Sequence, residues 1–276
     1  MSFEKITSLH NERIKNLVRL QKSAERKNQN LILIEGWREI RQAVREGFQL
    51  AFIYLNEDKA DSENLHDLKE FKEKIVLLSP SVFKKIAYRE NTEGVLAVAV
   101  PKFHTFDELK LSENPLFIVL ESVEKPGNLG AVLRTAEATG VDAVIVCDPV
   151  TDLYNPNIIR SSLGCVFSVP VVTCNNSEAI EFLKKKQIRM FAAELTASKR
   201  YDLADFRQSS AIILGTEATG LTSEWIKAAD ESIIIPMQGA HDSLNVSVSV
   251  AILVFEALRQ RGFGMYVSIN SNIKSK

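Results

Sequence analysis

Six short apolar runs in the second part of the chain constrain its fold more than any other sequence feature. Each run is apolar almost throughout and does not alternate with polar residues, which is typical of parallel strands covered on both faces. Polar stretches with helical spacing separate several of the runs. The alternation predicts a doubly wound α/β domain, in which ligands bind beyond the carboxyl ends of the strands. Strands are expected over residues 116–123, 143–147, 166–173, 188–195, 211–214 and 233–235, and helices over residues 129–139, 177–186 and 223–229.

The first part of the chain predicts a smaller α/β unit. It opens with a charged, amphipathic stretch at residues 11–28, which is expected to form a basic helix. A polar stretch between Pro101 and Pro115 follows this unit. We therefore expect a first domain over residues 1–105, a linker over residues 106–115 and a second domain over residues 116–276. Within the first domain, strands are expected over residues 31–34, 51–55, 75–78 and 94–100, and helices over residues 36–47 and 61–74.

Charge and composition restrict the partners. The formal net charge of the 276 residues is −1, so attraction by the whole molecule cannot drive binding to nucleic acid, and a local patch is needed. The first 30 residues supply a candidate patch, because seven Lys or Arg residues stand against three Glu residues there.

The cysteines and the apolar runs bear on the compartment. The three cysteines are widely spaced and form no C-x-x-C pair, so they support neither a disulfide framework nor a cysteine metal site. No apolar run approaches the roughly 20 residues that a membrane span needs, and the N-terminus has no apolar signal core. We expect a cytoplasmic protein without a metal or a membrane contact.

The loop after the first of the six runs carries a candidate anion-binding group. Pro126, Gly127 and Gly130 shape a tight turn at a helix start, with Asn128 inside the turn and Arg134 further along the helix. Arginine stays protonated and presents a fork of donors that suits a phosphate or a developing oxyanion. Taken alone, Arg134 is better explained as half of an ion pair on the helix surface. The G-x-G-x-x-G and P-loop patterns are absent, which weakens nicotinamide and nucleoside triphosphate interpretations.

Two later loops also leave strand ends with polar groups. In Gly215-Thr216-Glu217-Ala218-Thr219-Gly220, the two glycines allow a close backbone approach to a ligand, and Glu217 is either a functional group or a helix cap. After the run at residues 233–235, a polar loop leads to a long apolar helix that starts near Leu244. Ser243 and Asn245 flank Leu244, so hydroxyl, amide and free backbone N–H groups gather at a helix N-terminus.

The three segments together, in this order, resemble a known family. N-x-G-x-x-x-R-T-A from residue 128, G-x-E-x-x-G-L from residue 215 and I-P-M-x-G-x-x-x-S-L-N-V-S-V from residue 235 are similar to the three motifs of the SpoU (TrmH) family of RNA ribose 2′-O-methyltransferases. The resemblance spans about residues 116–261. Residues 31–36 and 94–98 are similar to the small substrate-binding domain of the family's ribosomal-RNA members.

This resemblance implies a SPOUT catalytic domain with a trefoil-knotted parallel sheet and S-adenosylmethionine as methyl donor. Where the family often has an acidic residue before the first proline, this chain has Lys125, preceded by Glu124. The resemblance assigns the cofactor to Gly215, Ile235 and Leu244, with Met237 and Gly239 in the same loop. It assigns the ribose and the reacting methyl group to Asn128, Arg134, Glu217, Ser243 and Asn245.

Simple chemistry agrees with these roles. Methyl transfer from a sulfonium to a hydroxyl is an in-line displacement, so the protein must align the two groups and stabilise the oxygen as it loses its proton. Arg134 is expected to bind an RNA phosphate near the 2′-hydroxyl and to favour the alkoxide. Ser243 and Asn245 would orient the hydroxyl or the cofactor, and Glu217 would position donors or take part in proton removal.

The sequence therefore predicts S-adenosylmethionine-dependent methylation of a ribose 2′-hydroxyl in RNA, with 23S ribosomal RNA as the expected substrate. A transfer-RNA methyltransferase of the same family is one alternative, and a non-catalytic RNA-binding or ribosome-assembly protein with the same fold is another. The helix over residues 244–260 is apolar on most of its circumference, which fits either a core helix or a subunit contact. The resemblance favours a homodimer through the catalytic domain.

Overall fold

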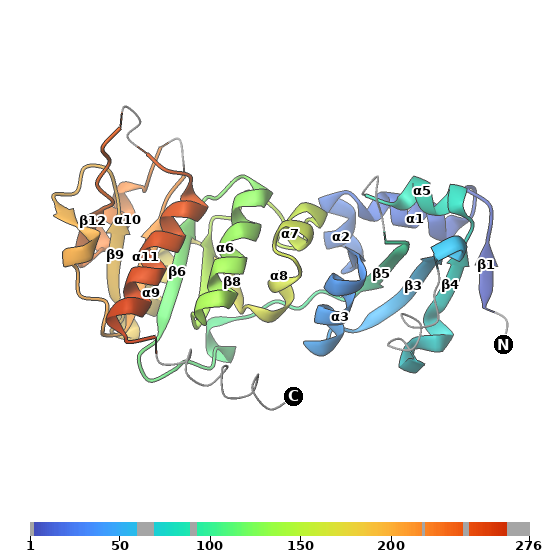
Figure 1. Ribbon diagram of the computed structural model, residues 1–276, viewed down its shortest axis with the longest axis horizontal. Coiled ribbons are helices and arrows are strands. Elements are labelled where there is room, and N and C mark those ends of the chain that lie inside the picture. Colours follow the sequence, from blue (N-terminus) through green and yellow to red (C-terminus); the bar gives the residue numbers. More distant parts are fainter. Residues whose placement is uncertain (1–2, 60–68, 89–92, 217–218, 240–242, 264–276) are drawn as a thin grey trace. The chain divides into compact units, whose positions relative to one another are not determined.

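A computed structural model describes residues 3–59, 69–88, 93–216, 219–239 and 243–263 (Figure 1). Contacts divide the chain into two compact units. Unit 1 consists of Met1–Lys102 with Asp152–Ser168, and unit 2 of Phe103–Thr151 with Val169–Lys276. The expected division near residues 106–115 treated the second domain as one continuous stretch. The contacts instead group residues 152–168 with the first part of the chain.

Unit 1 contains a five-stranded mixed sheet with the strand order β1-β4-β3-β5-β2. β5 runs antiparallel to β2 and β3, whereas β1, β3 and β4 are mutually parallel. The strands are β1 (Glu4–Ile6), β2 (Ile32–Glu35), β3 (Leu50–Asn56), β4 (Ile75–Leu78) and β5 (Val95–Ala99). The helices are α1 (Glu12–Leu20), α2 (Ser23–Gln29), α3 (Trp37–Arg45), α5 (Pro80–Ile86), α7 (Pro156–Ser161) and α8 (Cys165–Ser168), with 3-10 turns at Glu57–Lys59 and Lys69–Lys74.

The basic helix expected over residues 11–28 is two helices, α1 and α2. Lys22 has an extended backbone and breaks the helix between them. The guanidinium of Arg26 then turns back and donates to the carbonyl oxygens of Leu20 (2.9 Å) and Gln21 (2.8 Å) at the end of α1. Arg26 also forms a buried ion pair with Asp152 at 2.6 Å. One of the counted bases is therefore part of the interior, while most of the others stay on the surface.

Unit 2 contains a seven-stranded sheet with the order β10-β12-β9-β11-β6-β7-β8. Every neighbouring pair is parallel, which confirms the parallel sheet predicted from the apolar runs. β11 lies between β6 and β9, so strands distant in sequence become neighbours. The strands are β6 (Leu116–Glu121), β7 (Ala143–Cys147), β8 (Val171–Cys174), β9 (Arg189–Ala193), β10 (Lys199–Arg200), β11 (Ser210–Leu214) and β12 (Glu231–Ile234).

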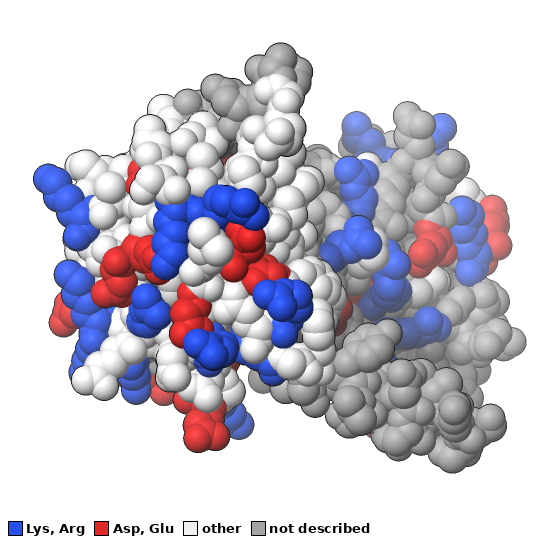
Figure 2. Space-filling view, turned by 60° about the vertical axis from the view of Figure 1, so that its left-hand side comes forward, with Lys and Arg blue, Asp and Glu red and all other residues white. Residues whose placement is uncertain are grey.

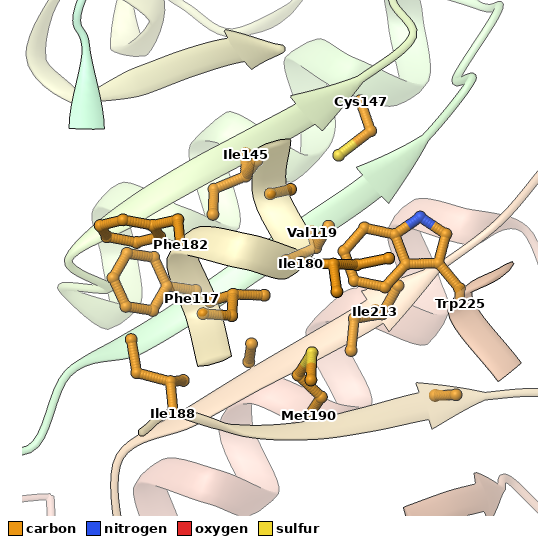
Figure 3. Packing of buried hydrophobic residues seen from close by; sticks show 14 of the residues in the cluster. Phe117, Val119, Ile145, Cys147, Ile180, Phe182, Ile188, Met190, Ile213 and Trp225 are labelled. Atoms are coloured by element: carbon orange, nitrogen blue, oxygen red, sulfur yellow. The ribbon is translucent and has the colours of Figure 1, made fainter. Parts of the chain in front are cut away.

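Helices cover both faces of this sheet. α6 (Pro126–Thr139) and α11 (Val246–Gln260) pack against each other on one face, and α9 (Asn176–Lys185) and α10 (Ser223–Ala228) lie on the other (Figure 1). On the α9 side, the fully buried Trp225 lies beside Ile180 and Ile213 in a core of aliphatic and aromatic side chains (Figure 3). These helices hold the strand ends at fixed positions.

The strand predicted over residues 166–173 is wrong in its first half. Residues 165–168 form the short helix α8, and β8 begins at Val171. Val169 and Pro170 separate the two elements, because proline has no N–H group to donate to a sheet. The carbonyl of Pro170 still accepts from Val144 N at 3.0 Å, which sets where β8 joins β7. Strand order alone does not trace how the chain threads, so the trefoil knot stays a prediction.

None of the helices within the described ranges has the length and apolar character that a membrane span requires. Across the same ranges, no group of three or more His, Cys, Asp and Glu side chains is placed to hold a metal ion.

Candidate active site

A cavity of about 540 Å³ lies at the carboxyl ends of β9, β11 and β12, which are neighbours in the unit 2 sheet. Its volume falls within the range of small-molecule sites, about 300–1,000 Å³. The predicted cofactor residues Gly215, Ile235, Met237 and Leu244 line it, and so does Ser243. Two of the predicted segments, about 20 residues apart in the chain, therefore converge on one cavity.

The wall formed by Gly215 admits no side chain. A Cβ atom at this position would lie 2.1 Å from the carbonyl oxygen of Gly220 and 2.5 Å from Leu221 N. The close approach arises because Thr216 and Gly220 bond to each other through both backbone groups, at 3.2 and 3.1 Å. Gly220 adopts a φ of +68°, which favours glycine. The first glycine is needed for space and the second for its backbone conformation.

The start of α11 joins the first and third segments. Asn245 caps the helix, since its Oδ1 accepts from Ser247 N at 3.0 Å. Its Nδ2 donates to Asn128 Oδ1 at 3.1 Å, across 117 positions of sequence. Two residues that the sequence assigned to the acceptor ribose are thus in direct contact.

A second hollow of about 100 Å³ adjoins the cavity. Asn128 lines it together with Glu124 and Lys125, and Gly215, Thr216 and Val246 border both spaces. The larger space suits a bound small molecule, and the smaller one offers a place for a second reactant beside it.

Arg134 and Gly239 line neither of these spaces. Arg134 is exposed on α6, and it forms no hydrogen bond or ion pair with the described residues. The surface ion pair that the sequence left open is therefore not found within the described ranges. Gly239 is also exposed, and a Cβ atom there would meet no atom within 4 Å. Glu217 lies outside the described residues.

The sequence interpretation missed Glu121, the last residue of β6. Its side chain is 2% exposed, and its carboxylate accepts from Asn176 Nδ2 (2.6 Å), Thr222 Oγ1 (2.7 Å) and Thr222 N (2.8 Å). Asn176 Oδ1 in turn accepts from the indole N–H of Trp225 at 2.7 Å. The network fixes Thr222, which directly follows the Gly215–Leu221 loop. The sequence signal that could have identified Glu121 is an acidic residue at the end of an apolar run.

Replacing Glu121 with glutamine should destabilise the protein by roughly 1–3 kcal/mol, because the new NH₂ group would face a donor and leave it unpaired in the interior. Chemical denaturation followed by circular dichroism measures this change. Glu181→Gln, a substitution on the exposed side of α9, is the matched control and should change stability by no more than about 0.5 kcal/mol. Equal stability of both variants would contradict the role assigned to Glu121.

The buried thiol of Cys147 lies near the strand ends, in surroundings that disfavour its reactive form. Cys147 and Cys174 are paired across β7 and β8, and their hydrogen bond together with burial raises the pKa of the Cys147 thiol well above its usual range. Because the reactive form of cysteine is the thiolate, the site does not support covalent catalysis by Cys147.

Charges on unit 2 are of mixed sign. Figure 2 shows Lys and Arg side chains interspersed with Asp and Glu on the face turned forward. Glu231, for example, pairs with Lys199 and lies 3.6 Å from Arg189. Among the described residues that line the large cavity, Glu194 is the one charged side chain. The cavity therefore favours a neutral or cationic ligand over an anionic one.

Comparisons with known proteins agree with this geometry. The profile of the SpoU rRNA Methylase family matches residues 115–255, and the profile of the MRM3-like substrate binding domain matches residues 11–97. A crystal structure described as an RNA 2′-O ribose methyltransferase is 41% identical, with a TM-score of 0.82 over 93% of this chain and 99% of that one. The SpoU methyltransferase AviRb from Streptomyces viridochromogenes is 25% identical, with a TM-score of 0.84 over 92% of this chain and 99% of that one.

A curated relative from Bacillus subtilis (strain 168) is similar over nearly the full length of both chains. It is named 23S rRNA (guanosine(2553)-2′-O)-methyltransferase RlmP and is 29% identical over 91% of this chain and 98% of its own.

Proposed function

Because the chain belongs to the SpoU rRNA Methylase family, we propose that it transfers a methyl group from S-adenosylmethionine to a ribose 2′-hydroxyl of 23S ribosomal RNA. The observation that carries this proposal is the convergence of the first and third segments through the Asn128–Asn245 hydrogen bond, next to a cavity walled by the second. We also propose that the enzyme acts in the cytoplasm and that its parallel sheet carries the trefoil knot typical of the family.

The cavity fits S-adenosylmethionine. This cofactor carries one net positive charge at neutral pH, and Glu194 offers the single charged group among the described lining residues. We assign the backbone of Gly215, Ile235 and Leu244 to its binding, with Met237 and Gly239 contributing from the same loop. When bound, the cofactor supplies an electrophilic methyl group on its sulfonium, so the protein's own groups need only bind, align and stabilise charge.

We assign the acceptor ribose to the smaller hollow. There Asn128 holds and orients the 2′-hydroxyl, supported by Asn245 through the hydrogen bond between the two amides, and Ser243 does so from the cavity side. Arg134 stays protonated, so it binds an RNA phosphate and stabilises the alkoxide rather than accepting a proton. Glu217 is the remaining candidate for positioning a donor or accepting the proton.

Unit 1 supports ribosomal RNA as the substrate. The match of residues 11–97 to a substrate binding domain supports a separate RNA-recognition part in this chain, which a minimal transfer-RNA enzyme would not need. The name of the similar B. subtilis protein, a 23S rRNA 2′-O-methyltransferase, also supports this substrate. A non-catalytic role would not need the Asn128–Asn245 contact beside the cavity.

Incubation with isotope-labelled S-adenosylmethionine tests the proposal. We expect label in 23S ribosomal RNA and much less in transfer RNA, and digestion to nucleosides should yield 2′-O-methylated ribose. Label mainly in transfer RNA would favour the related transfer-RNA activity. Measured cofactor binding without label in either RNA would favour the non-catalytic role.

We further propose that unit 2 forms a homodimer through α11. Val248 and Phe255 lie two helical turns apart on one side of the helix and are 45% and 46% exposed, with Ile252 half-buried between them. An apolar stripe on an otherwise buried helix is typical of an association surface.

Phe255→Glu should convert the dimer to a monomer, because the charge would have to be buried without a partner. Sedimentation velocity measures the change, and a shift of at least about tenfold in the dimer dissociation constant is expected. Val150→Glu is the matched control, since Val150 is 65% exposed and lies off α11. A wild-type protein that sediments as a monomer would rule out the dimer.

A further inference from the structure

Tyr88 is an exposed aromatic side chain of unit 1 that is held at both ends. Its backbone N–H donates to Glu35 Oε2 at 2.7 Å, and its hydroxyl oxygen accepts from Asn157 Nδ2 at 2.8 Å. The residue is still 44% exposed. Surface tyrosines usually rotate freely, so a ring fixed in this way loses little side-chain entropy when a flat ligand stacks on it.

The Tyr88 ring borders a small hollow of about 20 Å³ with an apolar floor. The floor is formed by Leu33, Ile86, Leu96, Pro156 and Ile159. Arg160 stands on the rim, with its guanidinium 6.0 Å from the centroid of the Tyr88 ring and its NH2 group 3.2 Å from Asn157 Oδ1. The hollow thus combines an apolar base, an aromatic ring and a cation.

Further cations flank this hollow. Lys84 and Lys85 lie on the last turn of α5, just before Tyr88, and Lys22 follows Gln21, which lines the hollow. All three lysines are exposed, and none forms an ion pair with a described residue. Among the described residues, Glu35 is the one carboxylate that lines the hollow. Its Oε2 accepts from the Tyr88 N–H, and its buried Oε1 has no hydrogen-bond partner among the described residues.

We propose that one unpaired base of the RNA stacks on the exposed Tyr88 ring, across the mouth of this small hollow, while Arg160 and the neighbouring lysines contact the flanking phosphates. The inference rests on the proposed function and deepens it, because it states that the substrate is single-stranded at this contact. Every base has a π face, so stacking tolerates any base. A duplex keeps its bases inside the helix and cannot offer one to Tyr88.

The test is fluorescence anisotropy with the full-length protein. The probes are a labelled single strand of about 12 nucleotides without self-complementarity and a duplex of the same length. The wild type should prefer the single strand, and Tyr88→Ala should weaken single-strand binding roughly 5- to 150-fold. Tyr88→Phe keeps the ring and should bind within about twofold of the wild type. Arg160→Ala should weaken binding and lower the slope of log affinity against log salt by about 1.

Phe103→Ala is the matched control, because Phe103 is a 58% exposed aromatic residue of unit 2. It should bind the single strand like the wild type, and unchanged circular dichroism shows that each variant is folded. The inference is overturned if Tyr88→Ala binds like the control, if Tyr88→Phe loses as much as Tyr88→Ala, or if the wild type prefers the duplex. A wild type that binds the cofactor but methylates no RNA would overturn the proposed function instead, so the two failures are distinguishable.

Discussion

Arg134→Ala should lower methyl transfer to RNA by about 10²- to 10³-fold, the usual cost of removing one group that stabilises a developing oxyanion. The side chain is exposed on α6 and forms no hydrogen bond or ion pair with the described residues, so its loss should leave the fold unchanged. It lines neither the cavity nor the adjoining hollow, so the affinity for S-adenosylmethionine should also stay unchanged. Single-turnover transfer of isotope label, beside calorimetric titration of the cofactor, separates these quantities.

Arg134→Lys shows whether charge alone is sufficient. Lysine keeps the positive charge but lacks the planar guanidinium that can donate to two phosphate oxygens at once. Arg134→Lys should therefore have a methyl-transfer rate between those of Arg134→Ala and the wild type. Arg207→Ala is the control, since Arg207 is another exposed arginine of unit 2 and is paired with Asp205 at 2.9 Å. It should transfer methyl groups like the wild type. Full activity of Arg134→Ala would remove this residue from the mechanism.

The sheet of unit 2 could be predicted from sequence because its strands are buried on both faces. β7 was predicted over its full length, since five consecutive apolar residues bounded by polar ones leave little choice of register. The same argument failed at residues 166–173, where an apolar run spans a buried helix and a strand, and periodicity cannot separate the two.

Contacts between residues far apart in the sequence could not be predicted from local sequence patterns. Residues 152–168 belong to unit 1 because α7 packs on β2 and α8 packs on α3. Local helix propensity does not determine which unit a helix packs against. Arg26 was counted as a surface base, whereas its partner Asp152 lies 126 positions away. The secondary structure of a segment can be predicted from its own residues, whereas the segment it packs against cannot.

Most of the candidate site came from motif resemblance rather than from periodicity. The motifs assigned Asn128 and Asn245 to the same site, and the structure places the two side chains in contact. The sequence analysis did not identify Glu121, because its role depends on Thr222, which lies 101 positions away. Its burial could not be predicted either, since a glutamate at the end of a strand is usually exposed. The residues of the proposed site are easier to recognise from sequence than residues such as Glu121, which fix the neighbouring loop.

Gly215→Ala should weaken cofactor binding strongly. The added methyl group would lie 2.1 Å from the Gly220 carbonyl oxygen, and this neighbour is backbone rather than the end of a flexible side chain. The paired hydrogen bonds between Thr216 and Gly220 would have to break or shift, which deforms the cavity wall. We expect a cost of about 3 kcal/mol, the upper end of overpacking, and hence a loss of roughly 100-fold or more in affinity for S-adenosylmethionine.

Gly239→Ala is the control that shows whether replacing a glycine of the site lowers cofactor affinity without a steric clash. A Cβ atom at Gly239 meets nothing within 4 Å, and its backbone does not adopt a positive φ, so the free protein should be as stable as the wild type. Calorimetric titration of both variants with the cofactor, beside thermal unfolding without it, gives the comparison. A lower affinity of the stable Gly239→Ala variant would mean that the cofactor itself approaches this position. Unchanged cofactor affinity of Gly215→Ala would mean that the cavity walled by the Gly215 loop is not the cofactor site.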